Sequence, residues 1–145
     1  MIIIVDTNIV FSAILNVNGL IGDLIFNSSE NFIFFAPELL LEEISRYNDK
    51  LLKLSKLTQE QLLESEYRIL SQIELISEKL ISQNSWHKAF EMTKNINEFD
   101  TPFVALAIEI DGILWTGDKK LLNGLQKLKW NKAYSSSDLQ NLRGY

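Results

Sequence analysis

The sequence has no cysteine, one histidine and two prolines among its 145 residues. The lack of cysteine excludes disulfide bonds, thiolate catalysis and every zinc or iron–sulfur site built on cysteine. Histidine-rich metal sites are excluded as well, and we expect His87 to lie on the surface of a helix. The hydrophobic runs are far shorter than the roughly 20 residues that span a bilayer, so we expect no membrane segment. Asp6 interrupts the first run and no basic segment precedes it, unlike a signal peptide, so we expect a cytoplasmic protein.

Composition and charge are those of a soluble protein. Hydrophobic residues make up 46% and charged residues 23% of the chain, which predicts a single globular domain over residues 1–145. The net charge of −5 is spread unevenly, with 8 basic and 17 acidic residues in 1–117 and 6 basic and 2 acidic residues in 118–145. A basic segment of this kind fits either a nucleic-acid contact or a solvated helix face, so charge alone assigns no partner.

Hydrophobic strand patterns alternate with helical patterns along the chain. We expect strands at residues 2–5, 32–36, 113–116 and 133–134, and a short strand at residues 73–76, which fit the continuation of a helix equally well. We expect helices at residues 9–15, 20–27, 37–52, 58–70, 83–95, 101–110, just after 118 and at 136–142, with Pro37 in the first turn of its helix and a capping box starting at Thr58. This alternation predicts an α/β fold with three layers, in which helices flank both faces of a central, mainly parallel sheet of four or five strands.

Three aspartates stand where such a sheet binds ligands, beyond the carboxyl ends of its strands. Asp6 directly follows the first strand, Asp118 follows the strand at 113–116, and Asp100 opens the helix that leads into that strand. Each one is a favoured helix N-cap by itself. Together they would repel one another unless a cation lay between them, and oxygen ligands of this kind suit Mg²⁺ or Mn²⁺.

Helical spacing selects a fourth acid. At about 100° per residue, Glu43 falls inside the hydrophobic arc that contains Leu40 and Ile44, whereas Glu42 falls on the solvent side. The same spacing places Asp100 on the core side of its helix. A glutamate among leucines is costly to bury unless a partner or a cation meets it. Glu43 is therefore either a metal ligand or a residue that reaches solvent at the edge of the arc.

Four segments resemble the motifs of the PIN domain family, in that family's order. Val5 to Ala13 is similar to the first motif, Glu43-Ile44 to the second, Asp100 to Ala107 to the third and Trp115 to Leu121 to the fourth. These motifs span most of the chain. Its size and single-domain form are similar to those of the toxins of VapBC-type toxin–antitoxin pairs. The resemblance implies the three-layer, Rossmann-like PIN fold.

The resemblance also implies an activity and a site. It implies an endoribonuclease that depends on Mg²⁺ or Mn²⁺, hydrolyses RNA phosphodiester bonds and acts as the toxin of a type II toxin–antitoxin system. The resemblance implies both a catalytic and a metal-binding role for Asp6, Glu43, Asp100 and Asp118. It also implies a supporting role for Asn8 and Thr116, which would orient the carboxylates or a metal-bound water.

Further expectations concern the partners. Lys119 and Lys120 stand beside Asp118, where they are available to bind RNA phosphates, although a solvated helix face explains them equally well. Many family members carry another acid just before the third motif, so a role for Glu98 stays open. The helices at 37–52 and 58–70 contain many leucines. Those that the core does not need are available for a homodimer face or for binding a small antitoxin protein.

Three other hypotheses remain. The chain fits a PIN-fold nuclease of RNA processing outside a toxin system, or a PIN-fold binding module without catalysis. Asp6 and Gly117-Asp118 are also faintly similar to haloacid-dehalogenase-like phosphatases. Those enzymes need an acid two residues after the nucleophile, and Asn8 cannot protonate a leaving group.

Overall fold

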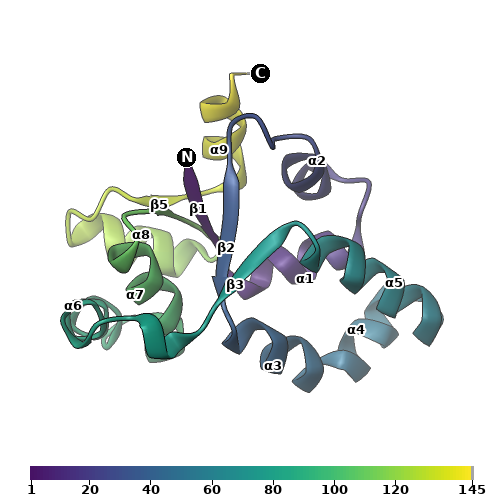
Figure 1. The fold of residues 1–145 in the computed structure, drawn as a ribbon, viewed down its shortest axis with the longest axis horizontal. Helices are drawn as coiled ribbons and strands as arrows, with labels where there is room; N and C mark the ends of the chain where they lie inside the picture. Colours follow the sequence, from purple (N-terminus) through teal and green to yellow (C-terminus); the bar gives the residue numbers. More distant parts are fainter. Residues whose placement is uncertain (145) are drawn as a thin grey trace.

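A sheet of parallel strands runs through the centre of the molecule (Figure 1). The structure is a computed structural model that describes residues 1–144. The strands in this range are β1 (Ile2–Val5), β2 (Ile33–Pro37), β3 (Ile73–Ile76), β4 (Ile113–Trp115) and β5 (Ala133–Tyr134). Their order in the sheet is β3-β2-β1-β4-β5, and every neighbouring pair is parallel. The prediction of a mainly parallel sheet is confirmed, with five strands.

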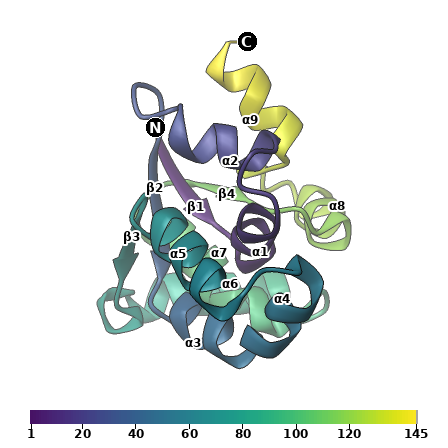
Figure 2. The same ribbon diagram turned by 90° about the vertical axis from the view of Figure 1, so that its right-hand side faces the viewer.

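Helices cover both faces of the sheet, as Figures 1 and 2 show. One face carries α6 (Gln83–Thr93), α7 (Thr101–Glu109) and α8 (Lys119–Lys127). The opposite face carries α1 (Thr7–Leu15), α2 (Leu20–Phe26), α3 (Leu39–Arg46), α4 (Asn48–Ser55), α5 (Gln59–Leu70) and α9 (Ser136–Arg143). Two short 3₁₀ turns, η1 (Glu78–Leu80) and η2 (Glu98–Asp100), precede α6 and α7. The predicted three-layer α/β/α architecture is therefore confirmed.

The first strand shows why the sheet is covered twice. In β1, Ile3 and Val5 join the core under α1 and α5, whereas Ile4 joins the core under α7, and all three side chains are fully buried. Successive residues of a strand point to opposite faces, so an uninterrupted β-branched run requires a hydrophobic layer on each side.

The segment expected as one helix over residues 37–52 forms two helices. Tyr47 separates α3 from α4 with backbone angles of φ −100° and ψ 15°, outside the helical range. Its ring makes an edge-to-face contact with Phe11 of α1, with ring centroids 5.7 Å apart. Leu51 of α4 is buried in the core of the α1 face. Packing against α1 thus accompanies a break in the helix that the hydrophobic pattern does not reveal.

Pro37 is also placed differently from the prediction. It is the last residue of β2, paired with Ile76 of β3, instead of lying in the first turn of the helix. The backbone N–H of Glu38 donates to Ile76 O at 3.0 Å, and the carboxylate of Glu78 accepts from the N–H of Leu39 at 2.6 Å. Strand pairing therefore continues past the proline. The carboxylate of Glu78, which is distant in sequence, accepts a hydrogen bond from a backbone N–H that has no partner within α3.

The predicted capping box at the start of α5 is confirmed. Thr58 Oγ1 accepts from the Gln61 N–H at 3.2 Å, and Gln61 Oε1 accepts from the Thr58 N–H at 3.0 Å. Within the described part of the chain, no single helix is long and hydrophobic enough to cross a membrane, although α1 and α2, bent by 106°, reach that length and composition as a pair.

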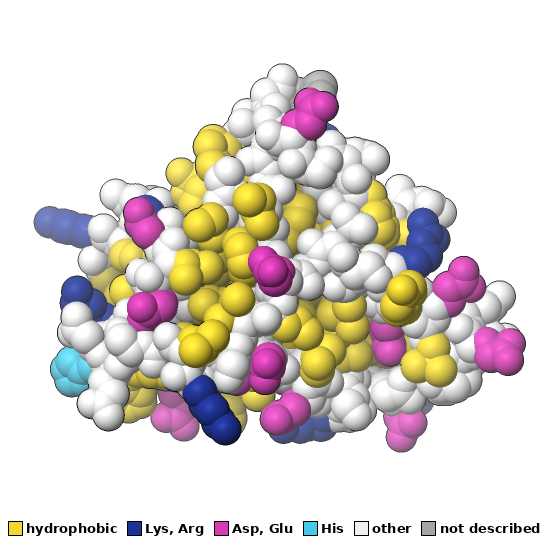
Figure 3. Space-filling model, viewed as in Figure 1, with side chains coloured by type: hydrophobic (Ala, Val, Ile, Leu, Met, Phe, Trp, Pro, Cys, Tyr) yellow, Lys and Arg dark blue, Asp and Glu magenta, His cyan; other side chains and the backbone are white. Residues whose placement is uncertain are grey.

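The surface seen in Figure 3 has no broad positive region. Acidic side chains are scattered over this view, Lys and Arg side chains stand singly near its margin, and hydrophobic side chains gather over the middle, where β2 and β3 run in Figure 1. His87 is exposed, as predicted.

Candidate active site

The strand order determines where a ligand site is expected. Connections from β1 lead outward through β2 to β3 on one side, and β4 and β5 continue on the other side. The order therefore reverses between β1 and β4, and crevices at such switch points are the usual ligand sites of open α/β sheets. Asp6 directly follows β1, and Thr116 directly follows β4.

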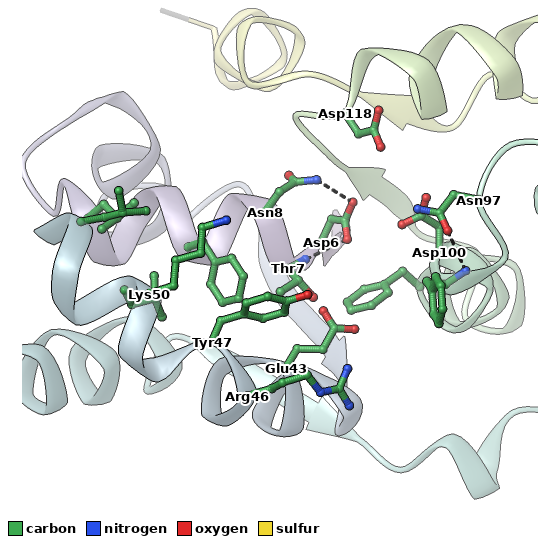
Figure 4. A pocket seen from close by; sticks show the side chains of 16 residues that line it. Asp6, Thr7, Asn8, Glu43, Arg46, Tyr47, Lys50, Asn97, Asp100 and Asp118 are labelled. Carbon is green, nitrogen blue, oxygen red and sulfur yellow. Dashed lines mark hydrogen bonds between the residues drawn. The ribbon is translucent and has the colours of Figure 1, made fainter.

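A pocket of about 560 Å³ opens at this switch point, and all four predicted carboxylates line it. Asp6 and Asp118 come from the starts of α1 and α8, Asp100 precedes α7, and Glu43 lies within α3 (Figure 4). Residues that are distant in sequence therefore share one cavity, as the spacing predicted.

Asp6 is held by a network that uses both of its carboxylate oxygens. Its Oδ1 accepts from the Thr7 N–H at 2.8 Å, and its Oδ2 accepts from Asn8 Nδ2 at 3.1 Å and from the Thr116 hydroxyl at 2.7 Å. Asn8 Oδ1 in turn accepts from the Gly117 N–H at 2.9 Å. The supporting role expected of Asn8 and Thr116 thus corresponds to contacts that orient this carboxylate and join the α1 and β4 ends.

The other two aspartates, Asp100 and Asp118, differ in how many hydrogen bonds their carboxylates accept from the protein. Asp118 caps α8, because its Oδ1 accepts from the N–H groups of Lys120 at 2.9 Å and Leu121 at 3.2 Å. Asp100 makes no such cap with its side chain, and its buried Oδ2 has no hydrogen-bond partner within residues 1–144. The buried hydroxyl oxygen of Thr7, in the wall of the same pocket, also lacks one in this range.

Burial and mutual repulsion raise the pKa of two of these acids. Burial is the largest cause for Asp6, whose pKa rises from 3.8 to about 6, although the hydrogen bonds from Thr116 and Thr7 oppose the rise. Burial also raises the pKa of Asp100 to about 7, and the negative charges of Asp6, Asp118 and Glu43 add to this effect. Because the negative charges in this site repel one another, a bound cation would stabilise it.

The family follows from comparison with known proteins. The sequence profile of the PIN domain matches residues 4–139, which is nearly the whole chain. This chain belongs to the PIN domain family. Comparison with curated proteins gives no match.

Solved structures share the PIN fold of this chain at low sequence identity. One such structure is that of VapBC2 from Rickettsia felis bound to a DNA fragment from the VapBC2 promoter. It superposes on this chain with a TM-score of 0.70 at 18% sequence identity, and the match covers 93% of this chain and 98% of that chain. The structure of PAE2754 from Pyrobaculum aerophilum superposes with a TM-score of 0.67 at 13% identity, covering 97% of this chain and 88% of that one. At these identities the likeness establishes the fold.

The carboxylates of this PIN domain suit a divalent cation by their chemistry, but they do not form a ready-made ligand set. Oxygen donors, the unpartnered Oδ2 of Asp100 and the raised pKa values all fit a hard cation such as Mg²⁺ or Mn²⁺. Among residues 1–144, however, no three or more His, Cys, Asp or Glu side chains stand close enough together to hold a metal ion. The metal-binding role of the four acids therefore remains a prediction.

Several predicted residues lie outside the pocket. Glu42 is exposed and does not line it, as the helical spacing indicated, whereas Glu43 does. Lys119 and Lys120 are exposed at the start of α8 and do not line it, so their contact with RNA stays a prediction. Glu98 is exposed and lines a neighbouring hollow instead.

Three polar residues that the motif comparison did not select line the pocket. Arg46 and Lys50 belong to its α3–α4 wall, and Asn97 belongs to the opposite wall (Figure 4). Arg46 stands three residues after Glu43, on the same side of the helix, and this spacing is a signal that sequence reasoning had available. Lys50 stands seven residues after Glu43, a spacing that the continuous helix expected over residues 37–52 also places on that side.

Proposed function

We propose that this PIN domain is an endoribonuclease that requires Mg²⁺ or Mn²⁺ and serves as the toxin of a type II toxin–antitoxin pair. The proposal rests chiefly on one observation. Four carboxylates that are distant in the sequence line a single pocket at the switch point of the sheet, and membership of the PIN domain family supports a nuclease. Hydrolysis would leave a 5′-phosphate and a 3′-hydroxyl.

Asp6, Glu43, Asp100 and Asp118 would hold the cation. A bound divalent ion supplies Lewis-acid stabilisation of the charge that develops on the phosphate and lowers the pKa of the attacking water. The contribution of the chain is to fix Asp6 through Asn8 and Thr116, so that at least one carboxylate needs no reorganisation during the reaction.

Arg46 and Lys50 would bind the phosphates of the RNA. Both side chains are exposed, line the acidic pocket and form no ion pair within the described residues. Four carboxylates repel a polyanion, so cations in the same wall are needed to bring the backbone close. This wall is the part of the pocket that carries positive charge.

The likeness to the structure of VapBC2 from Rickettsia felis supports an antitoxin partner for this chain. Exposed leucines such as Leu54 of α4 and Leu63 of α5 offer surface for that protein or for a second copy of this chain. An RNA-cleaving toxin of this kind would act in the cytoplasm.

The decisive experiment compares RNA cleavage by the wild type with cleavage by two pocket variants and one matched control. Asp6→Asn and Glu43→Gln should lower the rate by roughly two orders of magnitude or more, because each removes a proposed metal ligand. Glu42→Gln, one residue from Glu43 but outside the pocket, should cleave like the wild type. EDTA should stop cleavage, and end mapping should find 5′-phosphates.

Three results would count against this function. Equal activity in Glu43→Gln and Glu42→Gln would contradict the assignment of the site, and no cleavage of any RNA by the wild type would favour a binding module. Cleavage in vitro without Asp6-dependent growth arrest on expression in bacteria would favour RNA processing outside a toxin pair.

A further inference from the structure

Phe99 is a large hydrophobic side chain left in solvent next to the acidic pocket. It is 77% exposed, and it directly precedes Asp100 in the turn η2. Burying a phenylalanine side chain stabilises a fold, so this fold forgoes a substantial stabilisation at this position. A ring exposed at the border of a site is available for a ligand.

The ring belongs to two adjoining hollows at once. Phe99 lines the acidic pocket together with Asn97 and Asp100, and it also lines a hollow of about 530 Å³. The second hollow contains Trp86, Phe90 and Pro102, so aromatic side chains dominate it. A single RNA strand that ran from the carboxylates into the second hollow would pass Phe99, because Phe99 lines both.

The backbone under the ring is fixed although the ring is exposed. The Phe99 N–H donates to Asn97 Oδ1 at 3.0 Å, and the Thr101 hydroxyl donates to Glu98 O at 2.6 Å. These bonds hold the turn on both sides of Phe99. The backbone that carries the ring is therefore held in place relative to Asp100, which lowers the entropy lost when a ligand stacks on the ring.

Within residues 1–144, no Lys or Arg side chain is placed to hold an RNA strand within the second hollow, whose polar lining residues are His87, Glu98 and Thr101. The two cations of the acidic pocket belong to its α3–α4 wall. Base stacking on an aromatic ring needs no positive charge and suits single strands, whose bases are unpaired.

We infer that Phe99 stacks against an unpaired base of the RNA, next to the phosphodiester bond that is cleaved, and thereby helps to select the cleavage site. This inference rests on the proposed nuclease function and adds a specificity residue to it. Arg46 and Lys50 would hold phosphates on one side of the carboxylates, and Phe99 would hold a base on the other.

The first test measures stacking without cleavage. A short single-stranded RNA that carries 2-aminopurine is titrated with the Asp118→Asn chain in the presence of Mg²⁺, with and without Phe99→Leu. Fluorescence should fall several-fold when the probe base meets the Phe99 ring, and this quenching should be lost with leucine, which is hydrophobic but has no ring. Equal quenching in both chains, or none in either, would overturn the inference.

The second test measures cleavage in otherwise wild-type protein. Phe99→Leu should lower kcat/KM by about 5- to 150-fold, the equivalent of one stacked base, and alter the bases preferred beside the cut, whereas Phe99→Tyr should retain both. Tyr67→Ala is the matched control, because Tyr67 is 74% exposed on α5 but lies outside both hollows.

Salt separates stacking from phosphate binding. The ratio of wild-type to Phe99→Leu activity should stay constant between about 50 and about 200 mM salt, because stacking releases no counterions. Wild-type cleavage that Phe99→Leu leaves unchanged in rate and site would overturn this inference alone. Absence of cleavage by the wild type would overturn the proposed nuclease function, while the fluorescence result would still decide whether Phe99 binds a base.

Discussion

At the scale of single residues, two aspartates of the pocket, Asp6 and Asp100, differ in whether the protein donates hydrogen bonds to their carboxylates. Asp6 is 3% exposed and receives hydrogen bonds from Thr7, Asn8 and Thr116. Asp100 keeps a buried oxygen without a partner among residues 1–144. Both have raised pKa values, because burial penalises their charged forms. The metal-free protein therefore retains destabilising charges that a purely structural role would not require.

This arrangement predicts that the metal-free protein loses stability as pH rises. The pKa of Asp6 is 3.8 before it is perturbed and about 6 in the folded state, so the folded state binds more protons between these values. The free energy of unfolding must then fall from about pH 4 to about pH 7, by about 3 kcal/mol for Asp6. Asp100 contributes in the same direction, up to its pKa of about 7.

Thermal unfolding in EDTA at about pH 5 and about pH 8 checks this prediction. The wild type should have the lower Tm at the higher pH, and Asp100→Asn should reduce the difference, since an amide does not titrate. A Tm that rises with pH, or a difference that Asp100→Asn leaves intact, would contradict the electrostatic account of the pocket.

At the scale of elements, the α3–α4 wall gives the pocket its positive charge. Tyr47 ends one helix and begins the next, and its ring packs against Phe11. Arg46 stands just before this break and Lys50 three residues after it, and both line the pocket. Two helices therefore contribute cations to the wall that faces Asp100.

Removing either cation should weaken RNA binding and make it less sensitive to salt. Each lost phosphate contact should lower the slope of log affinity against log salt concentration by about 0.7 for single-stranded RNA. We expect this for Arg46→Gln and for Lys50→Gln. Lys53→Gln is the control, because Lys53 is exposed on the same helix but outside the pocket. A similar loss with Lys53→Gln would indicate a diffuse charge effect instead.

At the scale of the whole molecule, a divalent cation should act as a stabilising ligand. The chain has a net charge of −5, and four of its acids line one pocket. A ligand that binds the folded state stabilises it by about 2.7 kcal/mol at a concentration of 100 times Kd. The ion would also relieve repulsion among the carboxylates.

Addition of Mn²⁺ or Mg²⁺ should therefore raise the Tm by several degrees, and Asp100→Asn should abolish most of the increase. Glu98→Gln should keep the full increase, because Glu98 is nearby in sequence but lies in the neighbouring hollow. Identical increases in the wild type and in Asp100→Asn would mean that the metal binds elsewhere.

The extent to which the sequence predicted the site differs from residue to residue. The strand at residues 2–5 and the aspartate after it were predictable, because a β-branched run bounded by a polar residue has few alternatives. The inward position of Glu43 was predictable because it depends on neighbours within one helical turn. The place of Phe99 beside the pocket was not predictable, because Phe99 lies in the short turn η2, where no helical or strand periodicity applies.

The sequence by itself determined the alternation of strands and helices, the parallel sheet and the acids that belong to its carboxyl edge. These follow from short-range hydrophobic periodicity, which local sequence contains in full. Only the tertiary structure decided that α3 and α4 separate at Tyr47, that strand pairing includes Pro37, and that Phe99 shares a cavity with the acids. Those outcomes depend on packing between segments that are distant in the chain, and no local pattern specifies the partner against which a side chain packs.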